Sequence, residues 1–82
     1  MTYPIYCIRD LHTGFMSPMV DMNDNSAARQ FAHAIKATDG VMHTYPSDFD
    51  LFRIGTFVTE TGQIDPVWPI ELVMSGGDVL DI

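Results

Sequence analysis

Few side chains in this chain could perform catalysis or bind a metal: His12, His33, His43, Cys7, Asp48 and Asp50. The three histidines lack a metal-ligand spacing, such as two histidines four residues apart on a helix. The cysteine has no candidate base nearby in the sequence and falls in an apolar pattern typical of a buried residue. The two aspartates are expected to cap a turn or to be solvated. We therefore predict no enzyme, no metal site and no cofactor.

Three polar residues could instead bind a partner. Arg29, His33 and Lys36 are spaced at i, i+4 and i+7, so on a helix they form one stripe opposite an apolar face. Two of the four cationic residues of the chain lie in this stripe. It is typical of a solvated helix face, and alternatively of a docking surface for a phosphate backbone or an acidic protein.

Five aromatic residues on expected strands are the second candidate for binding: Tyr3, Tyr6, Phe52, Phe57 and Trp68. Aromatic side chains on a sheet can stack against single-stranded bases. In a domain this small they are more often part of the core. Tyr6 and Trp68, together with Arg53 on the third expected strand, join the helix stripe as candidate binding residues for protein or single-stranded DNA.

The elements that must position these residues follow from periodicity and turn signals: strands at 3–9, 15–21, 51–59 and 63–74, and one helix at about 25–38. Gly14 and Gly62 suit tight hairpin loops, and Pro18 weakens the second strand. Gly55 indicates a bulge or a close backbone approach, and Pro66 and Pro69 place part of the last strand at an edge. Residues 41–50 are expected to connect the helix to the third strand, with a single helical turn after Pro46.

The order ββαββ predicts an α+β fold, with an antiparallel sheet of about four strands and one helix across one face. The buried helix stripe is expected at Ala28, Phe31, Ala32 and Ile35. The third strand carries apolar residues on both alternating sets, so both sheet faces are apolar and a homodimer or small oligomer is expected. Residues 1–75 form the single domain, and residues 76–82 are expected to be a flexible acidic tail.

Charge and size limit the partners. The chain has 82 residues and a net charge of −7, which repels DNA and anionic lipid at long range. It contains no apolar run of the ~20 residues that a membrane helix needs. Binding of nucleic acid through phosphates usually needs several cations on one face. The composition therefore favours a protein partner and no membrane.

The chain as a whole resembles the small nonstructural protein of the gokushoviruses, single-stranded DNA phages of the microvirus family. The matching segments are residues 6–10, 13–15 and Pro18, then residues 24–31, residues 46–57, and Thr61 with Gly62. The helix start is similar to the family pattern D-x-x-A-x-R-x-F. Residues 46–57 are similar to its pattern P-x-D-F-x-L-F-x-I-G-x-F.

The resemblance implies a nonstructural accessory protein in the host bacterial cytoplasm, with no catalytic residues. It implies binding to phage replication or packaging proteins during synthesis of the single-stranded genome. One alternative is a single-stranded DNA-binding protein that uses Arg29, Lys36, Arg53 and the sheet aromatics. Another is an inhibitor of a host protein, which a small acidic protein can achieve by imitating the charge of nucleic acid.

Overall fold

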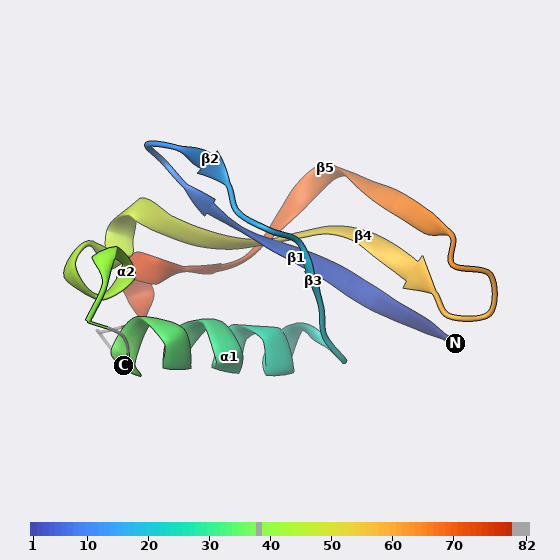
Figure 1. Cartoon of the computed structure of the whole chain (residues 1–82), viewed down its shortest axis with the longest axis horizontal. Coiled ribbons are helices and arrows are strands. Elements are labelled where there is room, and N and C mark those ends of the chain that lie inside the picture. Colours follow the sequence, from blue (N-terminus) through green and yellow to red (C-terminus); the bar gives the residue numbers. More distant parts are fainter. Residues whose placement is uncertain (38, 80–82) are drawn as a thin grey trace.

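The computed structural model describes residues 1–37 and 39–79. Its elements are β1 (Thr2–Asp10), β2 (Gly14–Phe15), β3 (Met19–Val20), α1 (Asp24–Ala37), α2 (Val41–Thr44), the 3-10 helix η1 (Pro46–Asp48), β4 (Phe49–Val58), β5 (Ile64–Ser75) and the 3-10 helix η2 (Gly76–Asp78). The strands form one antiparallel sheet in the order β2-β1-β4-β5, and β3 also pairs with β1. The main helix α1 runs along one side of this sheet (Figure 1). The expected α+β fold is confirmed.

Pro18 divides the second expected strand into two short pieces. β2 pairs with the end of β1, where Phe15 lies opposite Arg9, and β3 pairs with its start, where Val20 lies opposite Ile5. Because proline has no amide hydrogen to donate, the ladder cannot continue unbroken through it. The expected weakening of this strand is confirmed, and the sheet has five strands rather than about four.

The three glycines singled out in the sequence occupy the expected positions. Gly14 and Gly62 have φ angles of 104° and 76°, which side-chain-bearing residues rarely adopt. A Cβ at Gly55 would lie 2.8 Å from the carbonyl oxygen of Asp65. The backbones of β4 and β5 therefore approach each other here more closely than any residue except glycine allows.

The ladder between β4 and β5 is interrupted beside Gly55. Arg53 pairs with Glu71 and Gly55 pairs with Pro66, so one residue of β4 lies opposite residues 67–70 of β5. Extra residues on one strand leave the ladder and bend that strand. We call residues 67–70 the β5 bulge; it lies at the edge of the sheet because β5 is the last strand in the order.

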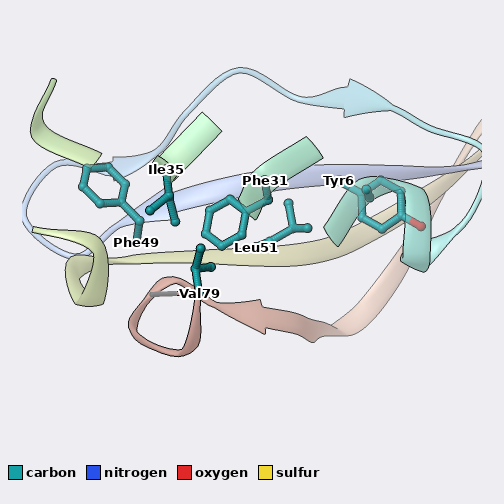
Figure 2. Close-up of a cluster of buried hydrophobic side chains, with 7 residues drawn as sticks. Tyr6, Phe31, Ile35, Phe49, Leu51 and Val79 are labelled. Carbon is teal, nitrogen blue, oxygen red and sulfur yellow. The ribbon is translucent and has the colours of Figure 1, made fainter. Parts of the chain in front are cut away.

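The core lies between α1 and the sheet, and its buried residues are Tyr6, Ala27, Phe31, Ile35, Phe49, Leu51 and Val79 (Figure 2). Phe31 and Ile35 confirm the expected helix stripe. Ala27 is more deeply buried than Ala28, and Ala32 is partly buried against the core, so the stripe is turned slightly toward Ala27.

The segment between α1 and the third expected strand is more ordered than a plain connection. Residues 41–44 form α2, and the helical turn expected after Pro46 is present as η1. β4 begins at Phe49 rather than at Leu51, and Phe49 is buried. The sequence did not predict Phe49 as a core residue, because it is flanked by two aspartates and so does not lie in a hydrophobic run.

The segment expected to be a free acidic tail is packed at its start. Gly76 begins η2, and Val79 is fully buried in the core. A Cβ at Gly76 would overlap the carbonyl oxygens of Pro46 and Phe49. The expected domain boundary after residue 75 is thus corrected, because residues 76–79 complete the core. Residues 80–82 of that segment lie outside the described residues.

The close packing at Gly76 predicts that a methyl group added at this position lowers the stability of the protein. We expect Gly76→Ala to lower the free energy of unfolding by about 1–3 kcal/mol, because the new Cβ must displace backbone. Gly77→Ala is the matched control, since its Cβ would meet Ser47 at an ordinary 3.4 Å. Urea denaturation of the two variants measures the difference. Equal midpoints would contradict the packing of η2 against η1.

Candidate binding surfaces

The helix stripe of Arg29, His33 and Lys36 is exposed on α1. All three lie away from the buried Phe31 and Ile35, as the helical period requires. Within the described part of the chain, neither Arg29 nor Lys36 forms an ion pair. Lys36 is in the last turn of α1, where a positive charge complements the helix dipole. The stripe is available to a partner.

Arg53 is separate from this stripe and is held by carboxylates. Its Nη1 lies 3.7 Å from Oδ1 of Asp24, and its Nη2 forms an ion pair with Glu71. The hydrogen bond to Glu71, followed by the charge of Asp24, raises the pKa of the guanidinium. Arg53 thus links the start of α1 to β4 and β5, and its charge is already neutralised.

Tyr6 is fully buried and cannot stack against a ligand. Its hydroxyl donates a hydrogen bond to Oδ1 of Asp24 at 2.6 Å. Burial first, and then this bond to a carboxylate, raise the pKa of Tyr6 well above its usual range. Tyr6 and Arg53 therefore meet at the same aspartate, where they join β1 and β4 to α1.

Trp68 is the most exposed large hydrophobic side chain among the described residues, at 84%. It lies in the β5 bulge, with Pro66 before it and Pro69 after it. The first part of β5 (orange) lies away from α1 in Figure 1. The candidate residues are thus not gathered in one site: the stripe is on the helix, Trp68 is at the sheet edge, and Tyr6 and Arg53 are structural.

The second apolar sheet face that the sequence predicts lies opposite α1, and it includes the candidate aromatic residue Phe52. The rings of Phe15 and Phe52 meet edge to face, with centroids 6.0 Å apart. The guanidinium carbon of Arg9 lies 4.8 Å from the centroid of Phe52, and Arg9 also forms an ion pair with Asp50 at 3.0 Å. The alternation of apolar residues along the strand that contains Phe52 is the sequence signal for this face. That alternation does not reveal which strands are neighbours in the sheet.

The described residues hold no group of three or more histidine, cysteine, aspartate or glutamate side chains arranged for a metal. Across residues 1–37 and 39–79, no helix is long and apolar enough to cross a membrane. A hollow of about 690 Å³ lies between α1, α2 and the turn after β1. It is open and mostly apolar, and its polar lining includes Asp10, Thr13 and Asp39.

Comparison with known proteins places the chain among phage proteins. It belongs to the family described as Phage ORF5 protein, whose model matches residues 3–79. The match covers every element of the fold, including η2. No curated protein and no solved structure matches the chain.

The hydrogen bond between Tyr6 and Asp24 predicts that removal of the Tyr6 hydroxyl lowers the stability of the protein. Tyr6→Phe should lower the free energy of unfolding by about 1–3 kcal/mol at neutral pH, because it leaves a carboxylate without its buried donor. Tyr3→Phe is the matched control, since among the described residues the Tyr3 hydroxyl has no hydrogen bond. Chemical denaturation measures both.

The same variant tests the raised pKa of Tyr6. A folded-state pKa above the unfolded value of about 10 stabilises the fold fully below pH ~10, and this stability is lost as the pH rises further. The stability gap between wild type and Tyr6→Phe should therefore shrink above pH ~10. A gap that stays constant in alkali would show that the hydroxyl ionises equally in both states.

Proposed function

We propose that this phage protein is a non-enzymatic accessory protein that binds replication or packaging proteins while the single-stranded genome is made. Membership of the Phage ORF5 family supports a phage accessory protein. The resemblance to the gokushovirus nonstructural protein is what suggests the finer role in replication or packaging. Such a protein would act in the cytoplasm of the bacterial host. Its means of action would be surface contact rather than chemistry.

The observation that carries the proposal is the exposure of Trp68 on the β5 bulge. Tryptophan is enriched among the few interface residues that supply most of the binding energy. Pro66 and Pro69 restrict the backbone around it, so ordering this segment in a complex costs little entropy. The indole supplies a large apolar surface and one hydrogen-bond donor for a pocket on the partner.

Charge supports a protein partner over a nucleic acid. The net charge is −7, and two of the four cations, Arg9 and Arg53, form ion pairs with carboxylates. Only Arg29 and Lys36 remain as free cations in the described part of the chain. The alternative of single-stranded DNA binding rests on these two residues and on Trp68.

Binding measurements with purified replication and packaging proteins of the same phage test the proposal. Trp68→Ala should weaken the relevant complex by at least about tenfold, as expected for an aromatic anchor. Tyr45→Ala is the matched control, because Tyr45 is also an exposed aromatic residue but lies beside α2. Circular dichroism of each variant shows that the fold is kept.

A parallel titration with labelled single-stranded DNA, at low and physiological salt, distinguishes the proposal from the alternative of DNA binding. The proposal predicts no saturable binding at low salt. Binding that weakens steeply with salt, and that is lost in Arg29→Ala/Lys36→Ala, would overturn it in favour of DNA binding. Failure of all tested phage proteins to bind would also contradict it.

A further inference from the structure

The sheet face opposite α1 is mainly apolar, and within it Ile5 and Cys7 of β1 are already buried in the single chain. In antiparallel pairs the two partners point to the same side, and side chains alternate along each strand. Because Tyr6 and Leu51 point to the helix, the register assigns the following residues to the other side: Tyr3, Ile5, Cys7, Arg9, Phe15, Val20, Asp50, Phe52, Phe57, Ile64 and Leu72. We call this set the open face.

The open face leaves several large apolar side chains in solvent. Phe15 and Val20 are each 52% exposed, Leu72 is 58% exposed and Ile64 is 64% exposed. These residues come from three different strands, β2, β3 and β5, so the exposure is not confined to one loop. Contiguous apolar surface of this kind marks an interaction site.

The charge of the open face differs from that of the whole protein. Its charged members are Arg9 and Asp50, which form an ion pair with each other. The face is therefore neutral, whereas the chain carries a charge of −7. A nucleic acid would find no unpaired cation on it. A second copy of the chain would meet its weakest electrostatic repulsion here.

We propose that two copies of this chain pack against each other through their open faces, as a two-fold symmetric dimer. Two-fold symmetry pairs a patch with itself, so a patch with one positive and one negative side chain is self-complementary. Arg9 of one protomer can then approach Asp50 of its partner while the aromatic pair Phe15 and Phe52 becomes buried. The Phe52 ring, which lies under Arg9, holds the guanidinium in place before the dimer forms.

The size of the face agrees with this occupant. The molecule measures 40 × 23 × 18 Å. The projected area of the molecule along its length is at most roughly 700–900 Å², which is on the scale of the about 800 Å² that a standard interface buries on each partner. Because each protomer carries −7, the dimer should strengthen as salt rises and screens the repulsion between protomers.

Sedimentation equilibrium of the purified full chain over a range of concentrations tests the proposal. We expect a reversible dimer for wild type and a loss of affinity of at least about tenfold in Leu72→Glu, which places a charge on the open face. Val41→Glu is the matched control, because Val41 is equally exposed at 61% but lies on α2. This variant should dimerise like wild type.

A charge exchange tests the proposed contact itself. Arg9→Glu alone and Asp50→Lys alone each give a face with two like charges, so each should dimerise more weakly than wild type. Mixed in equal amounts, the two variants should form a heterodimer, because their faces are then opposite in charge. Circular dichroism checks that both variants are folded.

Three results would overturn the proposal: a monomeric wild type at all concentrations and salt levels, a Leu72→Glu variant that dimerises like wild type, or a mixture of charge variants without heterodimer. None of these readouts involves Trp68, so the dimer and the proposed function can fail separately.

Discussion

The whole structure depends on one constraint: a single helix of 14 residues must cover a five-stranded sheet. A helix buries one apolar stripe, so only one sheet face can be covered by it. Phe31 and Ile35 of α1 fill the space above Leu51, and Tyr6 closes one end of this layer through its bond to Asp24 (Figure 2). Val79 is also buried in this cluster after the last strand. The largest buried cluster therefore lies on one side of the sheet, and on the other side Ile5 and Cys7 are also buried.

The uncovered side explains why the remaining features are surfaces. The apolar residues of β1, β4 and β5 that face away from α1 have no second helix to pack on. The interruption of the ladder at Gly55 also bends β5 and exposes Trp68 at its edge. The proposed dimer would use the exposed sheet face, and the proposed complex with a phage protein would use the protruding Trp68. Membership of a phage protein family fits a role of this type.

Local signals predicted much of the fold. Turn glycines, the break at Pro18 and the helical period of Phe31 and Ile35 each act over a few residues, so the sequence reveals them directly. The packing of Val79 was missed because it depends on a contact with α1, far away in the chain. Phe49 was likewise missed as a core residue, because the aspartates on either side of it interrupt the hydrophobic pattern.

The candidate site was predicted less completely. The exposure of Arg29, His33 and Lys36 follows from helical period alone. Tyr6 and Arg53 carry types of side chain that bind ligands, but their shared contact with Asp24 joins three separate elements and has no local signature. The pairing of Phe15 with Phe52 depends on strand order, which alternation within one strand does not encode.

The central claim, that α1 covers one side of the sheet and large apolar residues on the other side are exposed, can be tested by methyl NMR with a soluble paramagnetic agent. In dilute protein the methyl groups of Val20 and Leu72 should relax strongly, while those of Leu51 and Val79 should be shielded. Strong relaxation at Val79, or shielding of Leu72 in a monomer, would contradict the account, because the chain would then cover its sheet in a different way.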